Sequence, residues 1–364
     1  MRVINYFVLF VIVTAMIFMA GCTSEAASTQ DKVPAIKIGV MCPYTGDLSP
    51  YGQAVRNGVN LAFEKANPEN VELVYEDSAG SVKAAMDGIR NLVQEEDVQA
   101  VIGDITSGST LTAAPFANKY HVTLISASST SPDITDSGDY IFRTIPSDDQ
   151  QGRFASELIY TEGHHNLALI FTNNGYGVGL TKVVRESYAD LGGRIVADES
   201  VDAGSSDVSA LVSKLKAVNP DAVYLISNSP EITALVLNEI AVQGIDTRLY
   251  GSEGLMGQTT LDIGKPAEGL TITAVSSGTP EFAQEYEAAY GEGPGPFSAQ
   301  GYDAALALFK VIQEGALTKE EIKTALYSVE LDGVTGKVSF DENGNIDGGY
   351  IASTVKNGQF IEAI

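Results

Sequence analysis

The chain has 364 residues, with 47 acidic and 22 basic side chains, so its formal net charge is −25. An excess of carboxylates argues against nucleic-acid binding, because phosphates are neutralised by clustered Lys and Arg. A small neutral ligand remains compatible with this charge, and the length is sufficient for two α/β domains.

The N-terminus predicts export. Arg2 precedes a long apolar run that ends in Ala-Gly-Cys at Cys22, the pattern of a secretory signal. We expect residues 1–21 to be a lipoprotein signal peptide, Cys22 to carry lipid, and residues 22–33 to form a polar tether. The remainder would be extracytoplasmic and anchored to the outer face of the cell membrane. The alternative is an uncleaved helical anchor, since the run is close to the shortest that spans a bilayer.

After the tether, short β-branched segments alternate with amphipathic segments of helical length, which predicts parallel, doubly wound sheets. The expected strands are 36–41, 71–76, 100–103, 122–126, 167–172, 222–226, 248–251 and 270–275. The expected helices between them are 52–65, 82–95, 110–119, 152–161, 180–191, 208–218 and 232–243.

The alternation pauses at residues 143–147 and restarts at Asn166, which indicates a crossing between two domains. Residues 333–354 have a different pattern and predict a β-hairpin turned at Asn343-Gly344 or nearby. Residues 341–345 also have the spacing that begins a calcium-binding loop. However, that loop's required Gly and Glu are replaced by Ile346 and Ala352, so the hairpin turn is preferred.

Neither a catalytic centre nor a metal site is predicted. If Cys22 is lipidated, Cys42 has no disulfide partner. The three histidines are His121 and the adjacent pair 164–165, and sequence neighbours do not share one face of a helix or strand. The glycines of residues 175–179 lack dinucleotide-binding spacing, and there is no phosphate-binding loop or nucleophile elbow. We expect no enzyme activity and no cofactor.

Loops at the carboxyl ends of strands line the ligand crevice of doubly wound sheets. Hydroxyl-rich residues 106–110 open a helix after one strand, and residues 126–132 follow the next. Backbone N–H groups and hydroxyls at a helix start suit a carboxylate. The competing interpretations are that Ser107 only caps the helix and that the second loop is polar merely because it is a loop.

Glu253 lies between glycines directly after the strand 248–251. A carboxylate at the crevice would accept charge-assisted hydrogen bonds from an ammonium group. The alternative is an ordinary solvated loop acid. If both the hydroxyl loops and Glu253 face the crevice, together they form a receptor for a zwitterion.

Taken in order, these segments resemble the leucine/isoleucine/valine-binding protein family of ABC-transporter receptors, over essentially everything after the tether. The motifs that carry the resemblance are Ile38-Gly39-Val40 with Pro43-Tyr44-Thr45-Gly46 and Tyr51-Gly52, Val101-Ile102-Gly103 with Ser107-Gly108-Ser109-Thr110, Ile125-Ser126 with Thr130-Ser131-Pro132, Phe142-Arg143-Thr144, Tyr176-Gly177, Gly251-Ser252-Glu253-Gly254, and Phe340-Asp341-Glu342-Asn343-Gly344.

The resemblance implies two doubly wound lobes joined by three crossovers, with crossings near Pro146, Ser276 and Thr335. Ligand would be trapped between the lobes by hinge closure. The implied bounds are 34–147 plus 277–334 for lobe one, and 148–276 plus 335–364 for lobe two.

The resemblance also implies how the two charged ends of an amino acid are held. Ser107 and Thr130 fall where family members bind the α-carboxylate. The carbonyl near Ser128, together with Glu253, falls where they receive the α-ammonium.

Two tyrosines complete the implied site: Tyr51 would cover the ligand side chain, and Tyr176 would close over it from lobe two. A family aromatic position is occupied here by Asn228 and Ser229, which makes the side-chain pocket roomier or wetter and weakens the case for strict leucine selectivity. The cysteine pair of some relatives is missing, with Thr106 at one of its places.

The expected function is therefore amino-acid transport. A monomeric receptor would bind branched-chain or other small neutral amino acids and deliver them to ABC permease subunits. The alternatives are an amino-acid sensor lipoprotein and a family member that binds an amide, urea or an aromatic acid.

Overall fold

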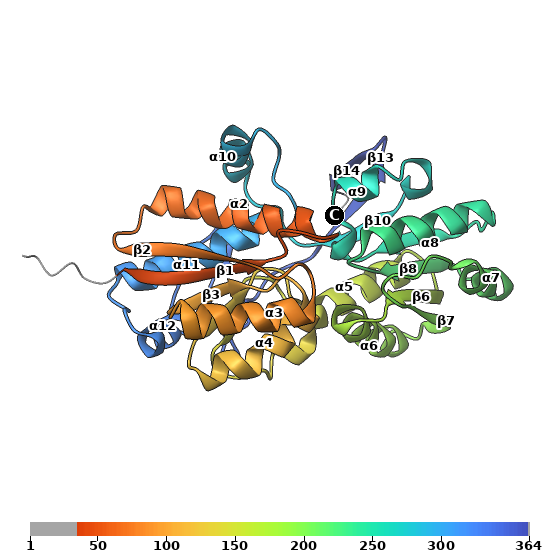
Figure 1. Cartoon of the computed structure of the whole chain (residues 1–364). Helices are drawn as coiled ribbons and strands as arrows, with labels where there is room; N and C mark the ends of the chain where they lie inside the picture. The colour runs from red at the N-terminus through yellow and green to blue at the C-terminus, as the bar shows by residue number, and fades with distance from the viewer. Residues whose placement is uncertain (1–34, 363–364) are drawn as a thin grey trace, which may run out of the picture. The chain divides into compact units, whose positions relative to one another are not determined.

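The computed structural model describes residues 35–362 (Figure 1). The predicted signal peptide, the whole predicted tether and the predicted lipidation site Cys22 lie outside the described residues. Within residues 35–362, none of the helices combines the length and the apolarity needed to cross a membrane.

The first sheet has five parallel strands in the order β2-β1-β3-β4-β5. Except in the partly exposed edge strand β2, the residues of these strands are buried and largely apolar, as expected for a parallel sheet that helices cover on both faces. The strands are β1 (Ile36–Cys42), β2 (Val71–Asp77), β3 (Ala100–Gly103), β4 (Thr123–Ser126) and β5 (Ile141–Arg143).

Side chains on β1 alternate between two cores, one on each face of the sheet. Ile38 and Val40 join the core formed with α2 and α11, whereas Met41 joins the core formed with α3 and α4. Figure 1 shows α2 and α3 on opposite sides of the sheet. The helices of this first lobe are α2 (Ser49–Ala66), α3 (Val82–Arg90, continued by a π-helical turn Asn91–Glu95), α4 (Ser107–Lys119), α10 (Pro280–Tyr290), α11 (Ser298–Gln313) and α12 (Lys319–Leu326).

The second sheet has seven strands in the order β14-β13-β10-β9-β8-β6-β7. The five strands from β10 to β7 are parallel, and β13 pairs antiparallel both with β10 and with the edge strand β14. The strands are β6 (Asn166–Thr172), β7 (Arg194–Val201), β8 (Ala222–Ile226), β9 (Arg248–Gly251), β10 (Thr271–Ala274), β13 (Ile351–Lys356) and β14 (Gln359–Glu362).

This sheet is also covered on both faces. Leu169 of β6 packs in the core with α5 and α6, and its neighbour Ile170 packs in the opposite core with α7 and α8. The helices of this second lobe are α5 (Asp148–Thr161), α6 (Gly175–Asp190), α7 (Ser209–Val218), α8 (Pro230–Val242) and the short α9 (Gln258–Leu261). Three short 3₁₀ turns complete the fold at Pro132–Ile134, Glu253–Leu255 and Lys265–Ala267. The predicted α/β class with two doubly wound lobes is confirmed.

The C-terminal hairpin was predicted at the wrong Asn-Gly pair. A tight turn does form at residues 341–344, but it is closed by only one bridge, between Phe340 and Ile346. The segment before it forms a separate two-stranded ribbon, β11 (Leu331–Asp332) with β12 (Lys337–Val338). The strand β13 instead pairs with β10 and with β14, turning at Asn357-Gly358, where both residues have positive φ as a type I′ turn requires.

Three connections join the two sheets, and they adjoin one cavity of about 280 Å³ lined by Pro146, Ser276 and Gly348, among others. Pro146 and Ser276, near which the first two crossings are predicted, both line it. After Thr335, however, Val338 and Ile346 still pack into the first-lobe core, so the packing favours a third crossing beyond Ile346. The exact lobe bounds remain a prediction.

Candidate ligand-binding site

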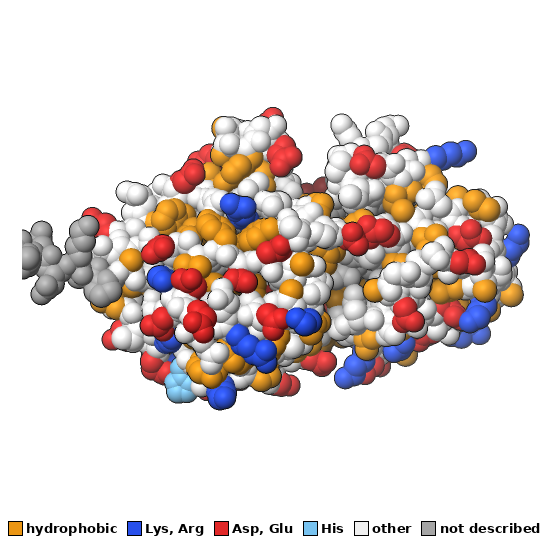
Figure 2. Space-filling view, viewed as in Figure 1, with side chains coloured by type: hydrophobic (Ala, Val, Ile, Leu, Met, Phe, Trp, Pro, Cys, Tyr) orange, Lys and Arg blue, Asp and Glu red, His pale blue; other side chains and the backbone are white. Residues whose placement is uncertain are grey.

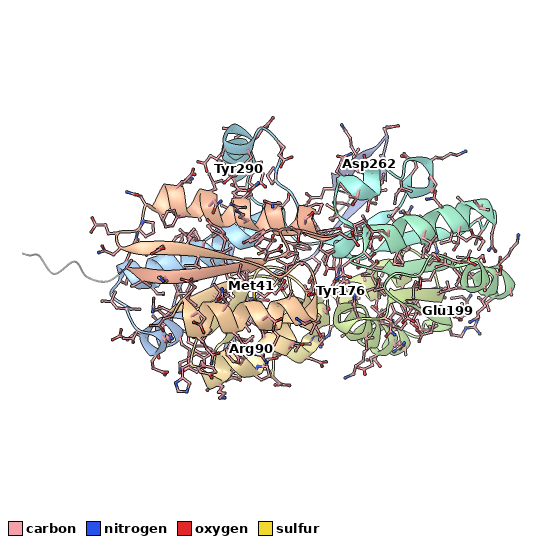
Figure 3. The ribbon with its side chains drawn as sticks, viewed as in Figure 1. Met41, Arg90, Tyr176, Glu199, Asp262 and Tyr290 are labelled. Carbon is pink, nitrogen blue, oxygen red and sulfur yellow. The ribbon has the colours of Figure 1, made fainter. Side chains whose placement is uncertain are left out.

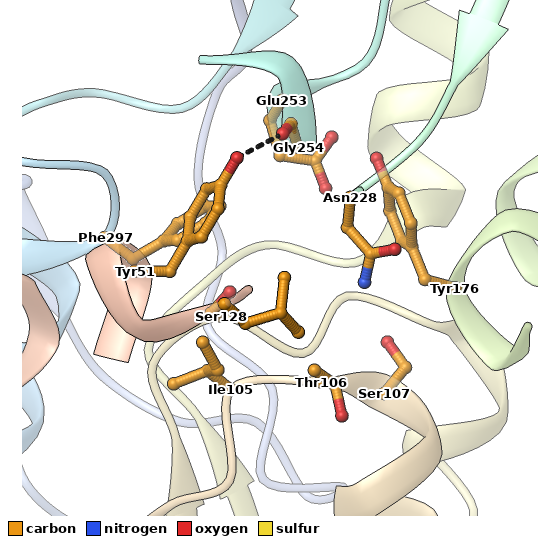
Figure 4. A pocket seen from close by; sticks show the side chains of 11 residues that line it. Tyr51, Ile105, Thr106, Ser107, Ser128, Tyr176, Asn228, Glu253, Gly254 and Phe297 are labelled. Atoms are coloured by element: carbon orange, nitrogen blue, oxygen red, sulfur yellow. Dashed lines mark hydrogen bonds between the residues drawn. The ribbon is translucent and has the colours of Figure 1, made fainter. Parts of the chain in front are cut away.

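A small pocket lies between the two lobes, at the carboxyl ends of the strands (Figure 4). The loops after β3 and β4 and the start of α2 contribute from the first lobe, and the loops after β8 and β9 and the start of α6 contribute from the second. The lining residues are Leu48, Tyr51, Ile105, Thr106, Ser107, Ser128, Tyr176, Asn228, Glu253, Gly254 and Phe297.

The hydroxyl-rich loops of the first lobe form a fixed network behind this pocket. The carbonyl oxygen of Asp104 accepts hydrogen bonds from the hydroxyls of Thr110 at 3.1 Å, Ser126 at 2.6 Å and Ser129 at 3.2 Å. Three bonds to one backbone oxygen hold the β3–α4 loop against the loop that follows β4. The backbone around the pocket is therefore positioned before any ligand arrives.

Thr106, and not Ser107, caps α4. Thr106 has extended backbone angles, and its Oγ1 accepts from the Ser109 N–H at 3.3 Å. The interpretation of Ser107 as only an N-cap is thus wrong. Ser107 is the first helical residue, and its Oγ accepts from the Ser131 N–H at 3.3 Å. Its hydroxyl hydrogen remains available to a ligand in the pocket.

Glu253 is buried, with 2% of its surface exposed, so it is not a solvated loop acid. Its Oε1 accepts from Thr130 Oγ1 at 3.3 Å across the two lobes. Its Oε2 has no partner among the described residues. Burial raises the pKa of Glu253 to about 7, although its own backbone N–H and the hydroxyl of Thr130 oppose the shift.

A second buried acid, Asp148, is the first residue of α5 and lies close enough to Glu253 for their charges to interact. Neither of its carboxyl oxygens has a hydrogen-bond partner within residues 35–362. Burial, followed by the nearby charge of Glu253, raises the pKa of Asp148 well above its usual range. Arg143 lies in the same interior and donates to the carbonyl oxygens of Thr130 and Ser131. Asp148 was not predicted as part of the site.

Two aromatic rings form one wall of the pocket. Tyr51 of α2 stacks on Phe297 with 6.2 Å between the ring centroids. The Tyr51 hydroxyl donates to the carbonyl oxygen of Gly254 at 3.0 Å, which links the first lobe to the second. Gly254 must lack a side chain, because a Cβ atom there would lie 2.2 Å from the carbonyl oxygen of Ser227.

The opposite wall comes from α6 and the loop after β8. Asn174 caps α6, with its Oδ1 accepting from the N–H groups of Tyr176 and Gly177 at 3.1 and 2.9 Å. Its Nδ2 donates to Asn228 Oδ1 at 3.0 Å. Tyr176 therefore enters the pocket from a well-capped helix start, at the junction of the two lobes (Figure 3).

The structure brings six of the seven predicted ligand-binding residues to one pocket: Tyr51, Ser107, Ser128, Tyr176, Asn228 and Glu253. Thr130 lies behind the pocket wall, fully buried, where it bonds Glu253. The ligand-binding roles of all seven residues remain predictions.

Phe297, Leu48 and Ile105 were not predicted to line this site. The first stands after a Gly-Pro-Gly-Pro segment, immediately before α11, with φ +63°. An aromatic residue between such a turn and a helix start is the signal that could have drawn attention to it. Among residues 35–362, no group of acidic, histidine and cysteine side chains is arranged to hold a metal ion.

The pocket itself is small, about 30 Å³. It adjoins a cavity of about 670 Å³ that shares Tyr51, Glu253 and Phe297 and is bounded by residues 292–297 on one side and 256–259 on the other. Figure 2 shows the surface hollowed between α10 and the α9–β14 region, above this cavity. The cleft between the lobes is therefore larger than the pocket at its inner end.

A sequence profile of the family described as "Periplasmic binding protein" matches residues 35–359. The chain belongs to this family. This periplasmic binding protein is 30% identical over 349 residues to the leucine-, isoleucine-, valine-, threonine- and alanine-binding protein of Pseudomonas aeruginosa, covering 91% of this chain and 92% of that protein. The family resemblance read from the motifs is confirmed.

Solved structures of similar proteins have the same fold. A leucine-binding protein from Thermotoga maritima matches this periplasmic binding protein with a TM-score of 0.85 and 27% identity, over 91% of this chain and 98% of that one. A branched-chain amino acid transporter substrate-binding protein from Streptococcus pneumoniae, solved with isoleucine, matches with a TM-score of 0.82 and 29% identity, over 90% of this chain and 100% of that one.

Proposed function

We propose that this periplasmic binding protein captures a free neutral amino acid between its lobes and delivers it to an ABC permease without chemical change. The observation that carries the proposal is Glu253, a buried carboxylate with an unpartnered oxygen. A buried carboxylate is costly unless a partner compensates it, and an α-ammonium group is a suitable partner.

The other end of a zwitterion would meet donors. Ser107 begins α4, so free N–H groups and the positive end of the helix dipole face an anion there. The Ser107 hydroxyl supplies a further donor. Glu253 and Ser107 line the same pocket. One ligand could therefore meet a carboxylate acceptor at one end and hydrogen-bond donors at the other. This arrangement favours a ligand that carries both charges over benzoate-like acids or urea.

Capture requires the lobes to separate and close again. A volume of about 30 Å³ holds roughly two water molecules, less than an amino acid needs. Ligand would first contact the first lobe at Ser107 and Ser128. Closure would then bring Tyr176 and Glu253 over it and form the bond between Tyr51 and Gly254.

The names of the similar proteins support branched-chain amino acids as the ligand class, with threonine and alanine also accepted by the relative from Pseudomonas aeruginosa. The proposal includes a monomeric receptor that performs no catalysis and is anchored to the outer face of the cell membrane by lipid on Cys22. Permease subunits would then receive the ligand from the closed lobes.

The deciding experiment is a calorimetric screen of the full chain in detergent against the twenty amino acids, benzoate and urea. We expect selective binding of small neutral amino acids with no turnover. Binding of benzoate or urea alone would overturn the amino-acid assignment. Uptake of the bound amino acid by cells that express this protein together with an ABC permease would separate transport from sensing.

A further inference from the structure

Arg143, the last residue of β5, is fully buried. Within residues 35–362 its guanidinium donates four hydrogen bonds, and all of them go to neutral oxygens. The acceptors are the carbonyl oxygens of Thr130 at 2.9 Å and Ser131 at 3.0 Å, the Thr135 hydroxyl at 2.8 Å and Asn345 Oδ1 at 2.8 Å. Burying a cation among neutral oxygens is costly, and apolar side chains often replace buried ionic groups without loss of stability. The contribution of Arg143 therefore lies in the groups that it holds rather than in filling the core.

Two of these acceptors belong to the loop after β4, which supports the pocket. The peptide group between Thr130 and Ser131 accepts from Arg143 through its carbonyl oxygen. The N–H of the same peptide group donates to Ser107 Oγ at 3.3 Å, and the Thr130 hydroxyl donates to Glu253 Oε1 at 3.3 Å. Ser107 and Glu253 stand at the two polar ends of the proposed ligand site. The guanidinium thus fixes one peptide group whose residues contact both ends.

A third acceptor, Asn345, comes from a distant part of the chain. It directly follows the turn that begins at Asp341, before the segment in which the packing favours the third crossing. The backbone N–H and the side-chain amide of Asn345 both donate to the Asp341 carboxylate, at 2.8 Å and 3.2 Å. The remaining oxygen of the amide therefore has a fixed position, and it accepts from Nε of Arg143. Asn345 in this way sets the orientation of the guanidinium.

We propose that Arg143 is a positioning residue for ligand binding: oriented by Asn345, its guanidinium holds the loop after β4 in the shape that the ligand requires. The inference rests on the proposed function and extends it to two residues that do not line the pocket. A loop that is already ordered loses little freedom when ligand binds, and this preorganisation raises affinity. A side chain outside the pocket thereby sets how tightly the pocket binds.

The arrangement requires the shape of a guanidinium as well as its charge. One terminal nitrogen bonds the carbonyl oxygens of Thr130 and Ser131, while the other two nitrogens bond Thr135 and Asn345. A lysine ammonium has its three donors on a single nitrogen and lacks this planar fork. Arg143→Lys should therefore loosen the loop although it keeps the charge.

The test measures binding of leucine and alanine to the full chain by titration calorimetry. Asn345→Ala should weaken both ligands roughly three- to tenfold, the effect that one net hydrogen bond supports, and Arg143→Lys should weaken them at least as much. Asn343→Ala is the matched control, because Asn343 is exposed in the same turn while Arg143 bonds Asn345. Its affinities should equal those of the native chain. Asn345→Ala leaves the buried guanidinium in place, so the comparison holds even if Arg143→Lys does not fold.

A double-mutant cycle with Thr130→Val distinguishes positioning from a general loss of stability. Thr130→Val keeps the shape of the side chain but removes the hydroxyl that bonds Glu253. If Asn345 and Arg143 act through Thr130, the double variant Thr130→Val/Asn345→Ala should lose less affinity than the product of the two single effects. Partial unfolding would instead lower the binding stoichiometry and leave the affinity of the folded fraction unchanged.

Three results would contradict the inference. Equal affinities of Asn345→Ala and Asn343→Ala would overturn it and leave the proposed function standing. The same holds if the two single effects in the double variant simply multiply. If the native chain binds neither leucine nor alanine, the proposed function fails, and this inference fails with it.

Discussion

Thr130 of the first lobe donates a hydrogen bond to Glu253 of the second, with 3.3 Å between Oγ1 and Oε1. This bond satisfies one oxygen of the buried carboxylate and leaves Oε2 unpartnered among the described residues. Oε1 of Glu253 thus forms a bond that joins the two lobes, and Oε2 is available to a ligand. Its dual position explains why Glu253 is the residue with the largest expected effect on binding.

Glu253→Gln should weaken binding of the preferred amino acid by about 2–5 kcal/mol, because the ammonium loses its charged partner inside a closed site. Titration calorimetry at pH 8, where the native carboxyl is ionised, measures the difference. Glu157→Gln is the matched control, since Glu157 is exposed on α5 of the same lobe. Equal affinity of Glu253→Gln and the native chain would remove Glu253 from the site.

Affinity should also depend on pH. Burial raises the pKa of Glu253 to about 7 in the ligand-free protein, so the carboxyl increasingly carries a proton below that pH. An ammonium ligand stabilises the ionised form, so binding releases the proton. Affinity should therefore fall as pH drops from 7.5 to 5, by up to about tenfold per unit. Calorimetry in two buffers of different ionisation enthalpy counts the released proton.

Asp148 provides the control for this assignment. Burial and the neighbouring charge of Glu253 raise its pKa well above the usual range, which favours its neutral form. Asp148→Asn replaces a neutral acid by a neutral amide of the same shape and should leave the pH profile in place. Loss of the profile in that variant, with its retention in Glu253→Gln, would assign the titration to Asp148 instead.

The eight strands that were predicted lie within about one residue of their observed bounds, because most of their apolar runs are buried and have little competing interpretation. Strands β5 and β7 were not predicted. Helix starts were less predictable. The helix α6 begins at Gly175 rather than near Leu180, because the Asn174 cap stabilises a glycine-rich first turn that otherwise indicates a loop. The turn of the C-terminal hairpin was also predicted wrongly. The C-terminal segment contains two Asn-Gly pairs, and only the burial of β13 against β10 decides which of them forms the turn.

The candidate site was predictable where a residue follows a strand, as Ser107, Ser128, Asn228 and Glu253 do. Phe297 was not, because it reaches the pocket from a turn distant in sequence. The bond between Asn174 and Asn228 was also beyond prediction, since it depends on the relative positions of two loops that periodicity does not fix.

Tyr51→Phe should destabilise the closed state without changing the aromatic wall. The variant keeps the ring that stacks on Phe297 but removes the hydroxyl that bonds the Gly254 carbonyl oxygen. One net hydrogen bond corresponds to a roughly two- to tenfold faster release of ligand. Stopped-flow measurement of the dissociation rate tests this.

Tyr75→Phe is the matched control, because the Tyr75 hydroxyl donates to Asn60 within the first lobe and lies away from the cleft. It should leave the dissociation rate unchanged. The same rate in Tyr51→Phe and the native chain would mean that the bond between the lobes contributes nothing to ligand retention.

Gly58→Ala tests the packing of α2 on α11, the contact that supports the first-lobe wall of the pocket. A Cβ atom at Gly58 would lie 1.9 Å from the carbonyl oxygen of Ser298, so the two helices would have to move apart. We expect the free energy of unfolding to fall by about 1–3 kcal/mol, the usual cost of overpacking. Urea denaturation measures it. In the control Gly293→Ala, no atom lies within 4 Å of the added Cβ, and stability should be nearly unchanged; equal stability of both variants would show that α2 and α11 can separate freely.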